Sequence, residues 1–104
     1  MKVTRVYISG PITNDPEYMI KFTAAENRLR SEGYSVVNPA KVNANLPNDF
    51  THEDYMRVSL AELACCEAIY MLDGWKDSKG AKEEYAYAGK LGLKVVREGL
   101  SNVT

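Results

Sequence analysis

The chain has 104 residues, enough for one domain with a single hydrophobic core, residues 1–104, and too few for two. Hydrophobic residues make up 45% and charged residues 26%, which is ordinary globular composition. The formal net charge of −1 argues against a basic surface that would bind nucleic acid polymers.

The first expected elements are a strand and a helix. A nearly continuous apolar run predicts a buried parallel strand over Val3–Ser9, which the following Gly-Pro pair ends. Asp15, followed by a proline, is typical of a helix start, and the helix should run to about Glu32. Its buried face should carry Tyr18, Phe22, Ala25 and Leu29.

A second strand is expected over Tyr34–Val37, and Asn38, which precedes a proline, closes it. Because strand, helix and strand follow one another closely, they should form a right-handed parallel unit. The segment Ala40–Phe50 is rich in asparagine and is expected to be the longest loop, in a position suited to a lid.

The second half of the chain repeats the alternation. A helix is expected from a capping residue at Thr51 to about Ala64, then a strand over Ala68–Leu72. A helix over Ser78–Leu91 and a strand over Leu93–Arg97 follow. The tail Glu98–Thr104 gives no clear prediction. The inner face of the first of these helices should carry Met56, Ser59, Leu60 and Leu63.

This alternation predicts the α/β class, with an open, doubly wound parallel sheet of four to five strands and helices on both faces. In such sheets ligands bind at the carboxyl ends of the strands, where the strand order switches. That edge should collect Ser9–Thr13, Asn38 and Asp73–Gly80.

Glu84 is the strongest candidate for chemistry. With Ser78 as N-cap, the helical period of about 3.6 residues places Glu84 on one face with Ala81, Ala88 and Leu91, so the acid points inward. Desolvating a carboxylate costs several kcal/mol unless the group is paired, protonated or beside a cavity. Glu84 is therefore either a nucleophile or base in a ligand cleft, or the partner of an internal Lys, Arg or Tyr.

Two segments of the same edge could approach a ligand through their backbone. In Ser9–Thr13, Gly10 could let backbone N–H groups turn toward an anion beside Ile12. The segment lacks the spacing of known phosphate-binding loops, so it could also be a plain turn. Ser78 opens a helix whose free N–H groups suit phosphate or sugar oxygens, and simple N-capping is the alternative. Gly80, which costs the first turn up to about 1 kcal/mol, favours close ligand approach.

Three further side chains allow two interpretations each. Asp73 and Trp75 could hydrogen-bond to and stack on a ring or sugar, or could equally cap a turn and pack against the loop. His52, the only histidine, is expected to be exposed rather than catalytic.

The chain carries no sign of an oxidising compartment or of a membrane. Cys65 and Cys66 are adjacent, which strains a disulfide between them and does not match the spaced pairs that bind zinc. No apolar run approaches the length of about 18 residues that spans a bilayer, and the N-terminus lacks an apolar signal core. A cytoplasmic protein with no membrane partner is expected.

The chain carries an ordered set of motifs: Val6–Ile12, Val37–Pro39, Asp54–Arg57, Ala68–Leu72 and Ser78–Ala81 with Glu84. This set resembles the nucleoside 2-deoxyribosyltransferase superfamily, in particular a branch of small bacterial and phage proteins of unknown function. The chain is also similar to deoxyribonucleoside 5′-monophosphate N-glycosidases. The resemblance spans nearly the whole chain and implies a flavodoxin-like sheet and cleavage or exchange of an N-glycosidic bond.

The resemblance implies roles for individual residues. Glu84 stands four residues after Gly80, where the family carries the glutamate that attacks the anomeric carbon. Tyr7 matches the tyrosine near that nucleophile, and the loop Gly10–Thr13 matches the glycine-containing loop. Six residues before the nucleophile, nucleoside transferases carry an aspartate and monophosphate hydrolases a serine, so Ser78 implies a phosphorylated ligand.

One position departs from the family pattern. Both enzyme groups carry an aspartate that assists the leaving base at the place where this chain has Ser59. Serine is a poor proton donor at neutral pH. Either another group such as Asp73 protonates the base, or the site binds a nucleotide without turning it over well.

The expected function is therefore N-glycosidic cleavage or transfer on a nucleotide or a related small molecule. Glu84 and Tyr7 would be catalytic, and no metal or cofactor is implied. The alternatives are a nucleotide-binding module and a structural domain with an internally paired Glu84. Because superfamily members complete their pockets with residues of a neighbouring subunit, a homodimer or higher oligomer is expected, with Leu100–Val103 reaching the partner. Ligand contacts are expected from Gly10, Ile12, Ser59, Asp73, Trp75, Ser78 and Gly80.

Overall fold

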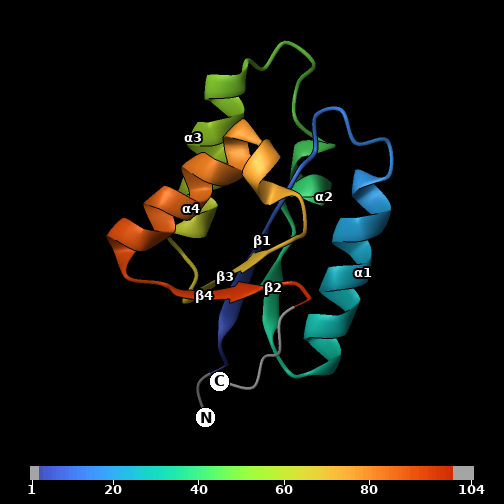
Figure 1. Ribbon diagram of the computed structural model, residues 1–104. Coiled ribbons are helices and arrows are strands. Elements are labelled where there is room, and N and C mark those ends of the chain that lie inside the picture. Colours follow the sequence, from blue (N-terminus) through green and yellow to red (C-terminus); the bar gives the residue numbers. More distant parts are fainter. Residues whose placement is uncertain (1–2, 100–104) are drawn as a thin grey trace.

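The computed structural model describes residues 3–99 and contains one four-stranded sheet (Figure 1). The strand order is β2-β1-β3-β4, and every neighbouring pair is parallel. The strands are β1 (Arg5–Ser9), β2 (Ser35–Val37), β3 (Ala68–Met71) and β4 (Lys94–Arg97). The helices are α1 (Tyr18–Ser31), α2 (Pro39–Asn43), α3 (His52–Leu63) and α4 (Lys79–Leu91), with a short 3-10 helix η1 (Trp75–Asp77). The predicted α/β class is confirmed.

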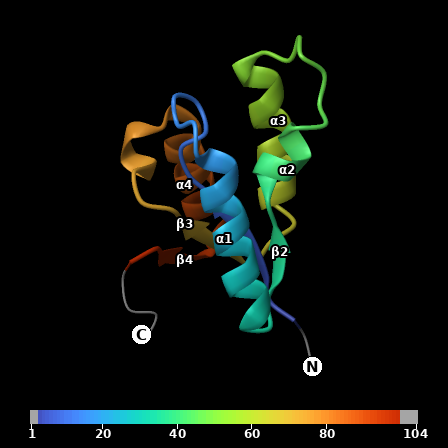
Figure 2. The ribbon, with the colours of Figure 1, turned by 90° about the vertical axis from the view of Figure 1, so that its right-hand side faces the viewer.

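The two faces of the sheet bury separate apolar clusters. Val6 and Ile8 of β1 pack with α1, whereas Tyr7, between them in the strand, packs on the opposite face with α3 and α4. Figure 2 looks onto one face of the sheet, with α1 in front of it and α4 behind. Because β2 and β3 flank β1 on opposite sides, the carboxyl end of β1 is the switch point of the strand order.

The first helix begins later than predicted. It starts at Tyr18 rather than after Asp15, because the Asp15 carboxylate accepts the Glu17 N–H at 2.9 Å and closes a turn before the helix. The buried face carries Phe22, Ala25 and Leu29 as expected, and also Glu26.

The expected loop Ala40–Phe50 contains a helix that the prediction missed. Asn38 caps α2 by accepting the Ala40 N–H at 3.0 Å, and Pro39 takes the first helical position. Asn38 and Pro39 are also typical of the end of a strand, which is the only role that the sequence analysis predicts for them. The η1 turn was likewise not predicted.

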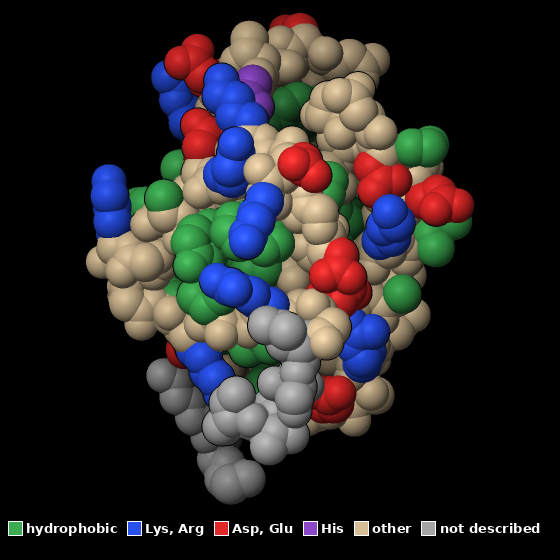
Figure 3. All heavy atoms as spheres, in the orientation of Figure 1, with side chains coloured by type: hydrophobic (Ala, Val, Ile, Leu, Met, Phe, Trp, Pro, Cys, Tyr) green, Lys and Arg blue, Asp and Glu red, His purple; other side chains and the backbone are tan. Residues whose placement is uncertain are grey.

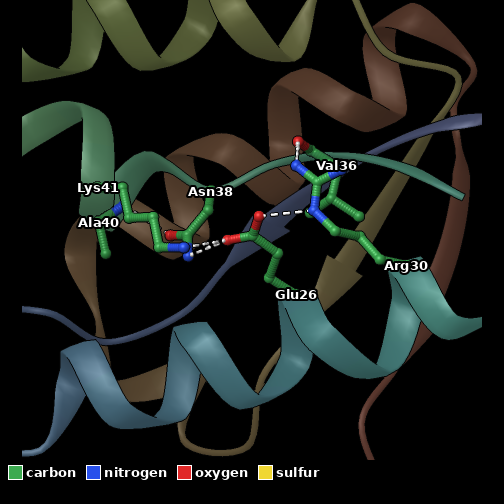
Figure 4. Close-up of polar contacts among 6 residues, drawn as sticks. All are labelled: Glu26, Arg30, Val36, Asn38, Ala40 and Lys41. Atoms are coloured by element: carbon green, nitrogen blue, oxygen red, sulfur yellow. Dashed lines mark hydrogen bonds and ion pairs between the residues drawn. The ribbon is translucent and has the colours of Figure 1, made fainter.

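A buried ionic cluster fixes α2 against α1 (Figure 4). The Glu26 carboxylate pairs with Arg30 Nε at 2.7 Å and Lys41 Nζ at 3.0 Å, and accepts the Asn38 side-chain amide at 3.1 Å. Burial raises the pKa of Glu26, but the hydrogen bonds from Arg30, Asn38 and Lys41 outweigh it and lower the pKa to about 2. The cluster therefore holds an ionised acid between the two helices.

The predicted caps of α3 and α4 are confirmed, and their predicted buried faces are confirmed in part. Thr51 and Asp54 form the expected capping box of α3, whose inner face buries Ser59 and Leu63. Ser78 caps α4 as expected. The prediction that Leu91 lies on the buried face of α4 is wrong: it is the last residue of the helix and is 42% exposed. Within residues 3–99, none of the helices is both long and apolar enough to cross a membrane.

Candidate active site

Glu84 lies in the second turn of α4 and points at the sheet. The Ala81 N–H donates to Ser78 Oγ at 3.2 Å, which fixes the start of the helix. From that start, the helical period directs Ala81, Glu84 and Ala88 toward β1 and β3, and Glu84 is only 7% exposed.

Two hydroxyl groups hold the carboxyl group of Glu84. Tyr7 Oη donates to one oxygen, Oε2, at 2.6 Å, and Ser9 Oγ donates to the other, Oε1, at 2.5 Å. Tyr7 and Ser9 are separated by one residue in β1, so both side chains leave the same face of the sheet. The partner of Glu84 is thus a tyrosine, as one of the two interpretations foresaw, joined by a serine that the sequence interpretation missed.

Burial controls the charge of this group. Burial raises the pKa of Glu84 to about 7, although the hydrogen bonds from Ser9 and Tyr7 act to lower it. The nearby acids Glu62 and Glu83 raise the pKa further. Burial, with the negative charge of Glu84, also raises the pKa of Tyr7 well above its usual value, so Tyr7 stays protonated and donates. With a pKa of about 7, both the acid and the carboxylate form of Glu84 are populated near neutral pH.

A cavity of about 290 Å³ opens beside Glu84 at the carboxyl edge of the sheet. Walls come from the loop after β1, from α1 to α3, and from the start of α4. Six of the predicted site residues line it: Gly10, Ile12, Ser59, Ser78, Gly80 and Glu84. Tyr7 does not line the cavity and reaches it through its bond to Glu84.

Asp73 and Trp75 are not among the residues that line this cavity. Trp75 stacks on Tyr85 at a ring distance of 4.6 Å, with Lys76 and Arg97 over its ring. Figure 3 shows Lys and Arg side chains around a hydrophobic patch on the half of the molecule that carries α4. The Asp73 N–H donates to Glu98 at 3.0 Å. Trp75 therefore takes the packing role that the sequence left as an alternative. The bond of Asp73 comes from its backbone, so the turn-capping role of its side chain stays a prediction.

Gly10 has a packing reason for being a glycine. A Cβ atom at this position would lie 2.8 Å from Leu72 Cβ and 2.9 Å from Leu72 Cδ1. The close approach that requires glycine is thus to the end of the neighbouring strand. At Gly80 a Cβ atom would meet Met56 Sδ at 3.5 Å, which is ordinary contact.

Several lining residues were not predicted as site residues. Tyr18 and Phe22 were assigned to the core alone, because their helical spacing cannot distinguish a core face from a cavity wall. The side-chain oxygen of Asn43 in α2 is buried and has no hydrogen-bond partner among the described residues. His52 is exposed as expected, yet it also lines the cavity, where its Nε2 lies 2.8 Å from Glu83. The remaining unpredicted lining residues are Thr13, Pro39, Ala44, Tyr55, Met56 and Ala81.

A comparison with known protein families identifies the family of this chain. Residues 4–97 match the family model described as "Domain of unknown function (DUF4406)". The chain belongs to this family. Searching curated protein sequences returned no significant match.

Among solved structures, the DUF4406 chain is similar to a 2-deoxyribosyltransferase from the psychrotolerant bacterium Bacillus psychrosaccharolyticus, described as a biocatalyst for the synthesis of nucleosides. The TM-score is 0.72 and the identity 19%, over 95% of this chain and 77% of that one. The expected resemblance in fold is therefore confirmed: this family member has the 2-deoxyribosyltransferase fold.

Proposed function

We propose that the protein cleaves or exchanges the N-glycosidic bond of a nucleotide or a nucleotide-derived small molecule, with Glu84 as the nucleophile. The observation that carries the proposal is the setting of Glu84: its carboxyl group lines a cavity and accepts two hydroxyl donors, and among residues 3–99 it forms no ion pair. A purely structural acid would be expected to have an internal cation and no open space beside it.

In the proposed reaction, an oxygen of ionised Glu84 forms a bond to the anomeric carbon while the bond from that carbon to the base nitrogen breaks. The electron pair of the broken bond leaves with the nitrogen, which takes up a proton. Water or a second base then attacks the same carbon, loses a proton to solvent, and releases Glu84 as a carboxylate. A hydroxyl such as Ser59, which lines the cavity, can relay the proton from solvent to the base.

The walls of the cavity support a ligand of this kind. At one end lie Ser78 and Gly80, where the free N–H groups of α4 and its dipole favour a phosphate or sugar oxygens. Tyr55 provides aromatic surface for a base, and Asn43 offers a side-chain oxygen that has no hydrogen-bond partner within residues 3–99. The volume of about 290 Å³ is near the lower end for small-molecule sites.

The test is release of free base from a panel of nucleosides and their 5′-monophosphates, measured by liquid chromatography. Wild type should release base from at least one phosphorylated substrate, and Glu84→Gln should lose at least about a thousandfold in rate, as expected for removal of a nucleophile. Glu32→Gln, an exposed acid at the end of α1, is the matched control. No release by wild type from any member of the panel would overturn the proposal.

A second experiment asks whether the ligand carries a phosphate. Ser78→Asp keeps a good helix cap but places a negative charge where the phosphate is proposed to bind, and Ser78→Asn is the neutral control of similar shape. We expect Ser78→Asp to weaken binding of monophosphates at least about tenfold relative to the free nucleosides, and Ser78→Asn to change that ratio little. Equal weakening of both ligand classes would contradict a phosphate subsite.

A non-catalytic nucleotide-binding module is the second candidate, and Ser59 favours it. Glu84 is the only carboxylic acid among the residues that line the cavity, so no second acid stands ready to protonate the base. Calorimetry with the same panel separates the two functions. Tight binding without base release would support the binding module.

We also propose that the protein is a homodimer or a higher oligomer. Leu91 and Val95 leave apolar surface exposed at 42% and 38%, and β4 is the edge strand of the sheet beside them. The segment Leu100–Val103, expected to reach a partner, lies outside the described residues. Light scattering that gives the mass of a single chain would refute this proposal.

A further inference from the structure

We propose that Ser9 is a positioning residue for Glu84: its hydroxyl holds the carboxyl oxygen that Tyr7 leaves free, fixes the orientation of the group and stabilises its ionised form. The catalytic consequence rests on the proposed function, but the contact itself does not. Nothing in the resemblance assigns a role to Ser9, and no structural comparison does so.

The geometry makes the two hydroxyl groups complementary. Ser9 Oγ lies 2.5 Å from Oε1 of Glu84, and Tyr7 Oη lies 2.6 Å from Oε2. A carboxyl group held at both oxygens cannot rotate about its last side-chain bond without breaking both contacts. Tyr7 alone would oppose that rotation with one hydrogen bond, so the second donor strengthens the restraint on the plane of the group.

Ser9 is itself held rigidly by the sheet. It is the last residue of β1, it pairs with Met71 in β3, and its carbonyl accepts the Leu72 N–H at 2.8 Å. Its exposure is 0%, so its hydroxyl has no solvent to bind. Holding Glu84 in place therefore costs little extra conformational entropy.

Ser9 acts on the site only through Glu84. It does not line the cavity, whereas Glu84 does, so a ligand there contacts the acid and not the serine. The charged groups that act on Glu84 are Glu62 of α3 and Glu83 of its own helix, and both are acids that oppose ionisation. Tyr7 and Ser9 of β1 are then the groups that favour the carboxylate form of Glu84. The hydroxyl of Ser9 therefore stabilises this form and does not merely fill space.

The experiment is an NMR titration of the Glu84 carboxyl carbon without any ligand, with the resonance assigned through Glu84→Gln. Ser9→Ala should move the titration midpoint upward by about one to two pH units, because a hydrogen bond to the charged form is lost. Ser9→Cys, a weaker donor of similar shape, should give a smaller upward shift. Ser35→Ala, the same change in the neighbouring strand β2, is the control and should leave the midpoint in place.

A midpoint in Ser9→Ala within a few tenths of a unit of wild type, or below it, would overturn the inference, since a merely structural serine would not shift the titration. Should Ser9→Ala fail to fold by circular dichroism, Ser9→Cys decides by the same shift. This titration needs no turnover. If wild type releases no base, the proposed function is refuted, but the titration still tests the role of Ser9 in holding Glu84. If base is released, the acid limb of its pH profile should move upward with the midpoint.

Discussion

Tyr7 and Glu84 are separated by 77 residues in the sequence, and their side chains meet at 2.6 Å at the carboxyl end of the central strand. Tyr7 is fully buried, and the acid that it contacts lines the cavity. A phenol that stays protonated is thus fixed against a carboxyl group that exchanges its proton near neutral pH. The contact joins β1 to α4 at the switch point of the sheet and couples the protonation of the acid to the position of the strand.

The pH dependence of activity should follow Glu84. Since burial raises the pKa of Glu84 to about 7 and the attacking form is the carboxylate, kcat/KM for base release should rise about tenfold per pH unit up to about pH 7 and then level off. Tyr7→Phe removes a donor to the carboxylate and should move this limb upward by about one to two pH units. The measurement is the rate between about pH 5 and pH 9. A flat profile would contradict ionisation of Glu84 as the required step.

The stability of the protein should also report Glu84. A folded-state pKa of about 7, above the ordinary 4.5, means that the folded protein holds a proton more tightly, so stability is lost as the pH rises through this interval. Glu84→Gln removes that loss. The free energy of unfolding of Glu84→Gln, taken relative to that of wild type, should therefore be about 3 kcal/mol higher at about pH 8 than at about pH 4.

Urea unfolding at the two pH values gives this difference, with Glu32→Gln correcting for the general effect of removing one negative charge. The same free-energy difference between Glu84→Gln and wild type at both pH values would show that Glu84 keeps an ordinary pKa in the folded protein.

The contribution of Glu26 to stability should depend on pH in the opposite direction from that of Glu84. The Glu26 pKa of about 2 lies below the ordinary 4.5, so its contribution is fully present above the ordinary value and is lost as the pH falls through about 2. Glu26→Gln should cost about 3 kcal/mol at about pH 7 and progressively less toward about pH 2. Urea unfolding measures the cost.

Hydrogen exchange locates the effect of Glu26→Gln. Because Asn38 and Lys41 tie α2 to Glu26, the amides of α2 should lose protection first. Uniform loss across the sheet would place the cost elsewhere. Lys41→Met, which removes one of the two cations, should give a smaller version of the same local change.

Two glycines offer a matched pair of substitutions with opposite signs. Gly10→Ala places a Cβ atom 2.8 Å from Leu72 Cβ and should cost about 1–3 kcal/mol of stability. Gly89 lies in the last turn of α4, where an added Cβ meets nothing within 4 Å, and Gly89→Ala should gain up to about 1 kcal/mol. Urea unfolding at neutral pH gives both values. A stable Gly10→Ala protein would mean that Leu72 moves aside without cost.

The segment Ala40–Phe50 shows what local interpretation misses. Asn38 and Pro39 carry the signals of a helix start, but the same residues also end a strand, and a helix as short as α2 has too few turns to show an apolar period. What stabilises α2 is the buried carboxylate of Glu26, twelve residues before Asn38, and no local pattern reveals that partner.

Periodicity, caps and short connections, which act between near neighbours, were enough to predict the order of strands and helices, the parallel sheet and the inward direction of Glu84. The tertiary structure decided what surrounds that acid. It placed Ser9 and Tyr7 on the two oxygens, moved Asp73 and Trp75 out of the cavity lining, and brought in residues of α1, α2 and α3 as walls. Hydrogen bonds and cavity walls join atoms that are distant in the chain, so they exist only once the helices have packed on the sheet.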